Sequence, residues 1–263
     1  MGVGYHVCFR SRCESVLAPT VAGRRAFAST LKRVGKERGL YGFGLSGRHG
    51  HAVLHGADAP VDTFLRAASR ALGTVLGLVV EGRVLKEVQS SWHEEDLVAY
   101  MHGQDLHHGT GVDPLREATS LPDLFGLRPD GLWLADRLRE VAPSITRADL
   151  LRQWGVTDLG ERDGLEHLAD AAAAAIGTDS LAGRSAPVVA ARAAAIVAAG
   201  DGVATASLAA ALGVDERSVQ RMRATRADPS LVRAIRRQLD LRARLPSSDL
   251  PFDVARVGPR PRR

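Results

Sequence analysis

Residues 40–55 read LYGFGLSGRHGHAVLH, and this stretch sets the fold expected for the first half of the chain. Residues 40–45 and 49–55 are rich in aromatic, aliphatic and β-branched side chains, which is typical of strands. Ser46-Gly47-Arg48 lies between them, and glycine supplies the backbone freedom that a tight turn needs. The stretch therefore predicts a β-hairpin. His49 and His51 lie two apart on its second strand, so their imidazoles share a face.

Further strands and helices are expected on both sides of this hairpin. Residues 4–10 (GYHVCFR) and 83–89 (RVLKEVQ) alternate in the manner of strands. A helix opened by Pro19 and Thr20 and a helix capped by Asp62 fill the gaps, since apolar residues recur there at helical spacing. The order β-α-β-β-α-β is the split βαβ arrangement of ferredoxin-like folds. We therefore expect an α+β domain with a four-stranded antiparallel sheet and helices on one of its faces.

The helix that follows the fourth strand carries a tyrosine and an amide on one face. Ser91 and Glu94 have the spacing of a capping box at its start, and Tyr100 and Gln104 lie one turn apart. We expect this helix to pack near the strand that holds His49. Two imidazoles, an amide and a phenol would then form a divalent-metal site beside a nucleophile. These are the groups needed to cut a DNA strand by covalent attack on phosphorus.

Length and composition indicate the class of protein. With 263 residues the chain suits two modest domains, and 45% hydrophobic and 25% charged residues are globular values rather than those of a disordered chain. Cys8 and Cys13 lack the spacing of a zinc knuckle, so we expect reduced thiols in a cytoplasmic protein. No apolar run approaches a membrane span, and residues 1–12 do not resemble a signal peptide. We expect a soluble protein associated with the nucleoid.

The net charge of +5 is unevenly distributed along the chain. It is +3 over residues 1–116, −6 over 117–183 and +8 over 184–263, where all 15 basic residues are arginine. Arginine binds phosphate and guanine through two parallel hydrogen bonds, a geometry that lysine lacks. The C-terminal excess therefore favours nucleic-acid binding. A solvated charged face is the alternative that charge alone leaves open.

Three blocks within the first 128 residues together resemble a known family. They are GYHVCFRSR (4–12), GFGLSGRHGHAVLHG (42–56) and DLVAYMHGQDLHHGTGVDP (96–114). In order and spacing they resemble the single-tyrosine transposases of the HUH nuclease superfamily, including the REP-associated tyrosine transposases. The pattern of that family is a YHVTFR-like strand, an LMPNHxH-like metal strand and a YIHxNPVRAGLV-like catalytic helix. Three ordered blocks are far more specific than a lone HxH motif.

The resemblance implies a role for each residue of the site. His49, His51 and Gln104 would hold Mg²⁺ or Mn²⁺, a choice of metal that the resemblance supplies. Tyr100 would attack a phosphodiester of single-stranded or hairpin DNA, which gives a 5′-phosphotyrosine and frees a 3′-hydroxyl. Tyrosine has a pKa near ~10 and is a weak nucleophile at neutral pH, which is why the reaction needs a metal or a base.

Three arginines are weaker candidates for contacts with the phosphate backbone: Arg48, Arg10 and Arg12. The chain also departs from the family pattern at four places. Gly47-Arg48 replaces Pro-Asn before the first histidine, and His107-His108-Gly109 replaces the RAG segment. Gly50 stands where a bulky apolar residue is usual, and Gln104-Asp105 replaces Asn-Pro after the tyrosine. Glycine in a strand loosens it and exposes its backbone. These departures leave open a catalytically inactive descendant of the family.

From Pro187 the sequence has the pattern of a helix-turn-helix. Helices are expected over residues 188–199, 208–212 and 216–226, with Thr205 and Asp215 as caps and Gly213 in the turn. Residues 188–222 also resemble the DNA-binding domain of the bacterial replication initiator, which is found appended to some of these transposases. The third helix would present five side chains to duplex DNA: Arg217, Gln220, Arg221, Arg223 and Arg226.

These expectations divide the chain into four parts. Residues 1–128 form the transposase-like domain, 129–184 an acidic helical connector, 185–245 the helix-turn-helix domain and 246–263 a disordered basic tail. The expected function is metal-dependent cleavage and rejoining of single-stranded DNA, as a transposase or nicking enzyme. The sequence leaves open the DNA target and whether the protein is a monomer or a homodimer.

Two other functions remain as alternatives. The first is a catalytically inactive, domesticated regulator that keeps the fold and reads DNA sequence with residues 217–226. The second is a metal-free RNA-binding protein, since a four-stranded ferredoxin-like sheet is also the platform of the RRM. Against the second, the strands lack the aromatic residues with which an RRM stacks bases.

Overall fold

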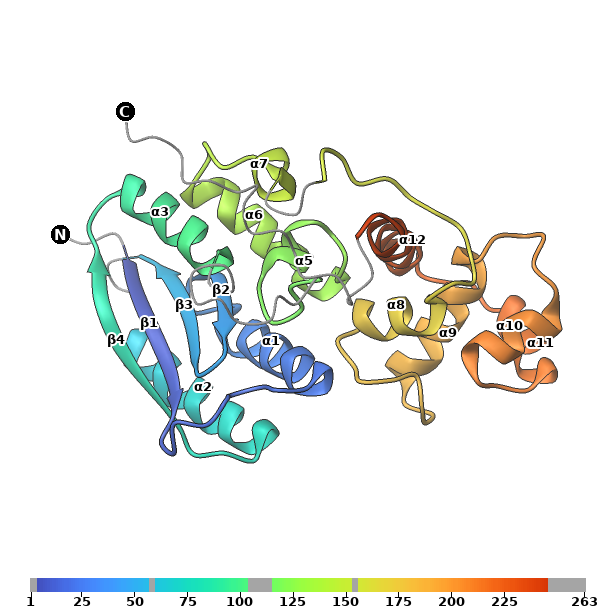
Figure 1. Cartoon of the computed structure of the whole chain (residues 1–263), viewed down its shortest axis with the longest axis horizontal. Coiled ribbons are helices and arrows are strands. Elements are labelled where there is room, and N and C mark those ends of the chain that lie inside the picture. Colours follow the sequence, from blue (N-terminus) through green and yellow to red (C-terminus); the bar gives the residue numbers. More distant parts are fainter. Residues whose placement is uncertain (1–3, 57–59, 104–114, 153–155, 246–263) are drawn as a thin grey trace.

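The structure is a computed structural model that describes residues 4–56, 60–103, 115–152 and 156–245 (Figure 1). Its strands are β1 (Gly4–Ser11), β2 (Leu40–Ser46), β3 (His49–His55) and β4 (Val80–Val88). Its helices are α1 (Val21–Gly35), α2 (Val61–Leu76), α3 (Ser91–His102), α5 (Leu121–Leu124), the 3₁₀ helix η1 (Pro129–Gly131), α6 (Leu132–Val141), α7 (Arg147–Arg152), α8 (Leu168–Ala175), α9 (Ala186–Ala198), α10 (Thr205–Leu212), α11 (Glu216–Arg223) and α12 (Pro229–Arg244). No helix in these ranges is long and apolar enough to cross a membrane.

The four strands form one antiparallel sheet in the order β2-β3-β1-β4. The predicted hairpin is present, with Ser46 paired to His49 and Gly47 in the left-handed conformation between them. The prediction of an α+β protein with a four-stranded antiparallel sheet is therefore confirmed.

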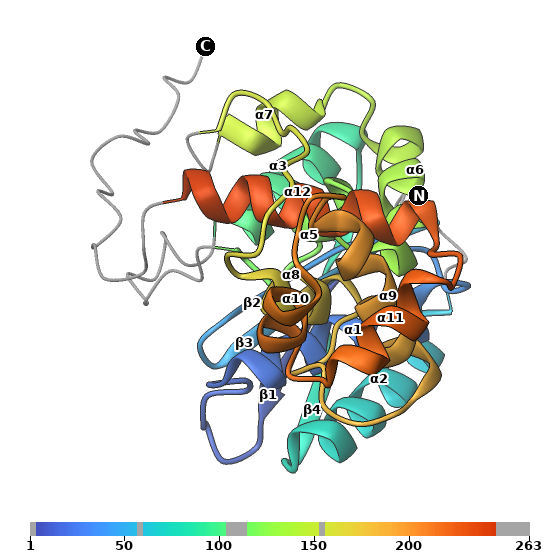
Figure 2. The same cartoon turned by 90° about the vertical axis from the view of Figure 1, so that its right-hand side faces the viewer.

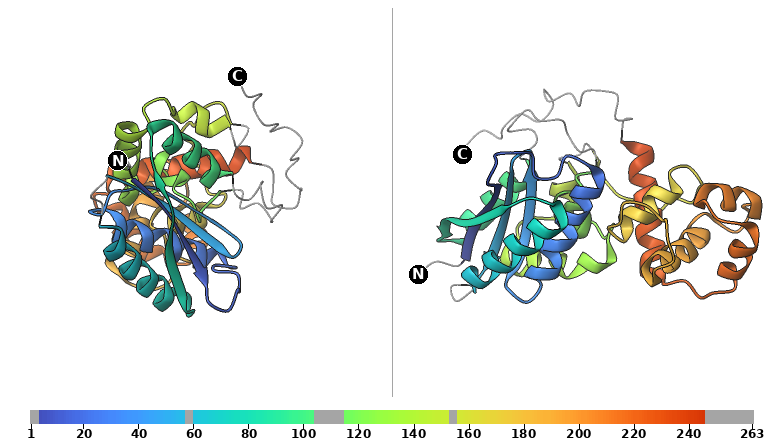
Figure 3. Two further views of the ribbon diagram at one scale, coloured as in Figure 1. Left: turned by 90° about the vertical axis from the view of Figure 1, so that its left-hand side faces the viewer. Right: turned by 90° about the horizontal axis from the view of Figure 1, so that it is seen from below.

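Helices lie on both faces of this sheet, so the prediction of helices on one face is wrong. On the face of α1 and α2, Phe27 packs edge to face against Phe43 and Phe9 against Phe64. The helix α3 lies on the opposite face, against β2 and β3 (Figures 1 and 3). All seven residues of β2 are buried, as expected for a strand that is covered from both sides.

The packing of α1 explains why a glycine, Gly50, lies between His49 and His51 in β3, which is called the histidine strand below. Gly50 faces α1, and a Cβ built there would lie 2.7 Å from Cζ of Phe27. The Phe27 ring therefore fills the space that a bulky residue at this position would need. Gly50 is itself buried, so its backbone is not exposed as the sequence suggested.

The apolar core consists of two clusters that share one helix. The first surrounds the sheet and extends through α6 and α7 to Leu159, and the second lies among α8 to α12. The helix α12 belongs to both, because Ile235 lies in the second cluster and Leu241 in the first. It crosses the molecule as the long red helix of Figure 2. The segment 129–184 thus carries helices, as expected, and its two halves contribute to different cores.

Buried ion pairs connect the sheet to the C-terminal helices. Arg25 of α1, whose side chain is 2% exposed, donates from Nη2 to Glu117 at 2.8 Å and to Asp170 of α8 at 2.6 Å. Its Nη1 donates to the carbonyl oxygen of Thr178 at 2.8 Å. Arg242 of α12 reaches the second carboxylate oxygen of Asp170 at 2.5 Å. Arg25 therefore joins α1 to α8 and to the segment of Glu117, and Arg242 adds α12 through Asp170.

The helices α10 and α11 lie on either side of a left-handed glycine. Gly213 has a φ of 61° at the C-terminus of α10, and the Asp215 side chain caps α11 by accepting from the Ser218 amide at 2.7 Å. The N-cap of α10 is Ala204 rather than Thr205, so that predicted cap is wrong. Pro60 likewise occupies the cap position of α2 and makes no side-chain capping bond, which places Asp62 in the first turn.

Replacement of Arg25 by methionine should destabilise the protein by about 3 kcal/mol, because the buried carboxylate of Glu117 would lose this cation and keep the longer ion pair with Arg242 at 3.6 Å. Urea unfolding measures the loss. The matched control is Arg139→Met, which removes an arginine that is 73% exposed and paired with Asp136, and should change the unfolding free energy by less than about 1 kcal/mol. Equal effects of the two substitutions would contradict a structural role for the Arg25 pairs.

Candidate active site

Two histidines and a tyrosine meet on the face of the sheet that α3 covers. His49 and His51 lie two apart on β3, with ring centroids 6.4 Å apart. Tyr100 of α3 places its ring edge to face against that of His51, at a centroid distance of 5.7 Å. The tyrosine is 37% exposed, so solvent reaches a side chain that the protein supports on one side. The structure thus brings together three of the residues that the sequence pattern selects.

A third histidine, His6 of β1, belongs to the same group. Its Nε2 lies 3.0 Å from Nδ1 of His51, a hydrogen-bond distance, and its ring is 6.2 Å from that of Tyr100. Burial lowers the pKa of His6 to about 4, and the charge of His93 acts in the same direction, so the ring is neutral at pH 7. The sequence analysis missed this residue, because a histidine in the first strand carries no signal until the register of β1 and β3 is known.

Two glycines in β2 let α3 approach the sheet closely. A Cβ at Gly42 would lie 2.8 Å from the Met101 side chain, and a Cβ at Gly44 would lie 2.5 Å from the Met101 carbonyl oxygen. Gly44 is paired with His51 across the sheet. The absence of a side chain at Gly44 therefore allows the last turn of α3 to rest beside the histidine strand, which sets the position of Tyr100.

The first turn of α3 is tied to the same strand by a carboxylate. Glu94 is 2% exposed and accepts from Nδ1 of His55 at 2.8 Å. Burial raises the pKa of Glu94, and its bond to His55 opposes that shift. The predicted capping box is wrong, since the N-cap is Ser90, which accepts from the His93 amide at 3.3 Å, and Glu94 binds the sheet instead.

The last turn of α3 is held by a buried segment that follows it. Nε2 of His102 lies 3.0 Å from Oγ of Ser120, and the amide of Ser120 donates to the carbonyl oxygen of Phe43 at 2.9 Å. Arg116, which is 1% exposed, donates to the carbonyl oxygen of His102. Both ends of the tyrosine helix are therefore fixed by polar contacts as well as by packing.

The donor set of the site suits a metal ion in part. Within the residues that the structure describes, no group of three His, Cys, Asp or Glu side chains is placed to hold a metal. His49 and His51 offer imidazole nitrogens, and Gln104, the third expected ligand, lies outside the described residues. Two imidazoles fit Mn²⁺ better than Mg²⁺, because Mg²⁺ prefers oxygen ligands.

The three arginines near the histidine strand differ in their surroundings. Arg10 is exposed on β1, where its Cα is paired with that of His49, and Arg48 is exposed in the turn before that histidine. Arg12 is occupied by an ion pair with Glu81 at 2.7 Å. Arg10 and Arg48 are therefore the better placed of the three for a strand that approaches the site.

The five C-terminal candidates are all exposed: Arg217, Gln220, Arg221, Arg223 and Arg226. Two of them also make contacts within the protein. Arg223 donates to Oγ1 of Thr205 at 3.1 Å and to the carbonyl oxygen of Val203, and Arg221 donates to Oγ of Ser218 at 2.9 Å. Arg223 thus helps to hold α11 against the start of α10.

Comparison with known proteins gives no relative from which a function could be transferred. No family model, no curated protein and no solved structure matches this chain. The geometry of the site itself is therefore the basis for a functional proposal.

Substitution of Gly44 by alanine should lower the unfolding free energy by about 1–3 kcal/mol, because the added methyl would meet the Met101 carbonyl and force α3 away from the sheet. The matched control is Gly202→Ala, since a Cβ there has no atom within 4 Å. Urea unfolding of both variants tests the expectation. It fails if the two substitutions cost the same.

Acid should destabilise the protein through His102. Complete burial, assisted by the charge of Arg116, lowers its pKa from the usual 6.5 to about 3. As the pH falls, the unfolded chain therefore binds a proton before the folded protein does, and stability is lost progressively between about pH 6.5 and pH 3. A change from pH 7 to pH 5 should cost about 2 kcal/mol through this residue.

Urea unfolding at the two pH values measures the effect, with His102→Gln as the comparison. Glutamine cannot titrate. The drop in unfolding free energy from pH 7 to pH 5 should therefore be about 2 kcal/mol smaller in the variant than in the unsubstituted protein, whatever the stability of the variant at pH 7. An unchanged difference would show that His102 does not titrate between the two states.

Proposed function

We propose that this protein is a single-tyrosine nuclease and strand transferase of the HUH type, which cuts and rejoins single-stranded or hairpin DNA. The observation that carries the proposal is the contact between Tyr100 and His51, on the face where His49 also lies. A phenol beside imidazoles on a sheet face is the arrangement that the covalent reaction requires.

The order of the elements supports the same proposal. The sheet unit runs β1-α1-β2-β3-α2-β4 and has the strand order β2-β3-β1-β4. We infer a ferredoxin-like topology from this combination, with the histidine strand β3 beside the first strand. The tyrosine helix α3 follows as an addition on the face that α1 and α2 leave open. This places His6, His51 and Tyr100 on three different elements that meet at one point.

Tyr100 would act as the nucleophile of the reaction. Its oxygen would attack the phosphorus of a phosphodiester, the bond from phosphorus to the 3′ oxygen would break, and the 3′-hydroxyl would leave with a proton. The bond energy stays in the 5′-phosphotyrosine, so a later 3′-hydroxyl can reverse the step without ATP. The partial exposure of Tyr100 supports this role, because a strand must reach its oxygen.

The histidines would hold and orient the groups of the site. His49 and His51, with Gln104 as the expected third ligand, would bind Mn²⁺ or Mg²⁺, and the bound cation would offset negative charge on the phosphate. His6 would act as a positioning residue, because its hydrogen bond fixes the ring of His51. A buried, neutral His6 adds no charge that would repel a cation.

We assign duplex DNA binding to α10 and α11, as a helix-turn-helix. Support comes from the glycine turn at Gly213, the capped start of α11 and the burial of Val219 of α11. The exposed side of α11 carries arginines and Gln220, which suit contacts with phosphates and base edges.

Covalent attachment to DNA is the decisive test. The protein is incubated with labelled single-stranded hairpin oligonucleotides and Mn²⁺, and a denaturing gel shows whether an adduct forms. Tyr100→Phe should abolish the adduct, and the matched variant Tyr5→Phe should retain it. Chelation of the metal should also suppress it, and His6→Ala should slow its formation by roughly tenfold or more. An adduct that persists in Tyr100→Phe would exclude this tyrosine as the nucleophile.

A catalytically inactive DNA-binding regulator is the second candidate. It is favoured by the exposed arginines of α11, which suit contacts with duplex DNA that need no metal. Duplex binding without an adduct on any hairpin tested would support this function and exclude the first.

A further inference from the structure

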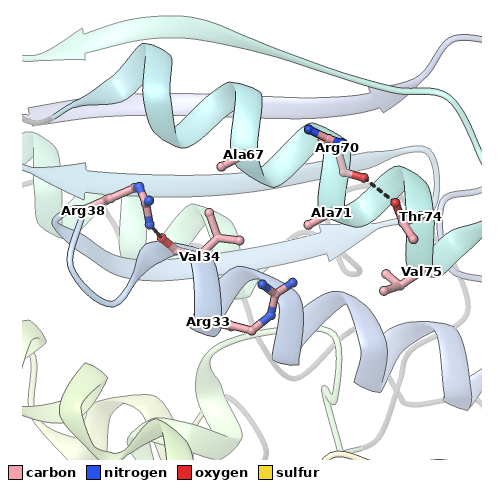
Figure 4. A pocket seen from close by; sticks show the side chains of 8 residues that line it. All are labelled: Arg33, Val34, Arg38, Ala67, Arg70, Ala71, Thr74 and Val75. Atoms are coloured by element: carbon pink, nitrogen blue, oxygen red, sulfur yellow. Dashed lines mark hydrogen bonds between the residues drawn. The ribbon is translucent and has the colours of Figure 1, made fainter.

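A groove lined by three arginines runs between α1 and α2, on the far side of the sheet from Tyr100. Its cavity volume is about 510 Å³. Figure 4 shows Arg33 and Val34 on one side of it and the α2 residues from Ala67 to Val75 on the other, with Arg38 at one end. None of the lining residues is acidic. The groove is therefore a concave surface with positive charge alone.

The guanidinium groups of this groove are available to a ligand to different extents. Arg33 and Arg70 are exposed, and among the described residues neither has an ion-pair partner. Arg38 is half-buried and donates from Nη1 to the carbonyl oxygen of Val34 at 2.5 Å. Arg38 thus caps the end of α1, and the two exposed arginines carry the unneutralised charge.

Small side chains keep the groove open. Ala67 and Ala71 lie on the α2 side, one turn apart, where longer side chains would fill the space between the helices. The Thr74 hydroxyl is turned back to the carbonyl oxygen of Arg70 at 3.0 Å. The α2 side of the groove is thus lined by short side chains, and its charge comes from Arg33, Arg38 and Arg70. This suits an extended chain with regularly spaced anions rather than a single buried ion.

We propose that this groove, referred to below as the α1–α2 groove, binds the phosphodiester backbone of DNA. The inference rests on the proposed function in one respect, since that function supplies DNA as the polyanion. It goes beyond that function because the groove lies on the face opposite the tyrosine, so its contacts are made outside the reaction site. Arg33 and Arg70 each offer a planar fork that matches two oxygens of a phosphate.

The salt dependence of binding tests this proposal directly. The affinity for a fluorescent hairpin oligonucleotide is measured by anisotropy, without added metal, at several salt concentrations. Removal of two phosphate contacts in Arg33→Ala/Arg70→Ala should lower the slope of log K against log salt by about 1–2, and should weaken binding about tenfold at low salt. Both side chains are exposed, so the fold should be kept, which a thermal melt checks.

The matched control is Arg139→Ala/Arg152→Ala. It removes the same charge from two exposed arginines that each pair with an aspartate three residues earlier. If both double variants change the slope equally, the effect comes from net charge and the α1–α2 groove is not a DNA site. If Arg33→Ala/Arg70→Ala lost affinity for a single-stranded RNA of equal length but kept its affinity for DNA, the proposal would also be overturned.

The adduct assay on the same samples separates this inference from the proposed reaction. If Arg33→Ala/Arg70→Ala binds like the control while the Tyr100 adduct still forms, the groove inference fails and the nuclease function stands. If the groove variant loses affinity and no variant forms an adduct, the groove inference stands and the nuclease function fails.

Discussion

The buried carboxylate of Asp123 is the constraint on which the rest of the structure depends. It is fully buried and is neutralised by Lys32 of α1 at 2.9 Å and by Arg128 at 2.5 Å. An unpaired charge in such a place would cost several kcal/mol, so the segment that carries it is fixed against α1. Gly131 completes the fit, because a Cβ there would lie 1.9 Å from Oδ1 of Asp123. Residues 116–128 are buried throughout, although they contain little regular structure.

This segment contacts both α3 and the C-terminal helices. On one side Arg116 and Ser120 hold the last turn of α3 and hence Tyr100. On the other side Glu117 forms an ion pair with Arg25, which also binds Asp170 of α8. Because α12 belongs to both apolar clusters, the sheet and the C-terminal helices share a helix instead of being joined by a free linker. The tyrosine and the arginines of α11 are therefore parts of one connected framework.

Local signals in the sequence predicted local structure well, and contacts between remote residues escaped them. The hairpin at residues 40–55, the Asp215 cap and the Gly213 turn each depend on neighbouring residues, and each is present. The pairing of His6 with His51 depends on strand register, and the bond between Glu94 and His55 depends on the position of α3 on the sheet. No local sequence pattern encodes the register or this position. The helix α12 was missed, although Asp228 caps its start and its apolar residues recur at helical spacing.

The buried histidine of the candidate site is neutral, and exposed arginines lie elsewhere on the protein. The imidazole of His6 is kept neutral by burial, and neutral imidazoles are the form that binds metal ions. Under the proposed function, the neutral ring of His6 would not attract DNA phosphates, so the attraction would come from other residues of the protein. Exposed arginines would supply this attraction at α11, in the α1–α2 groove and at Arg10 and Arg48, which lie close to His49. The arginines of α11 and of the α1–α2 groove lie away from Tyr100, so under the proposed function they would raise the affinity for the DNA backbone without adding positive charge beside His49 and His51.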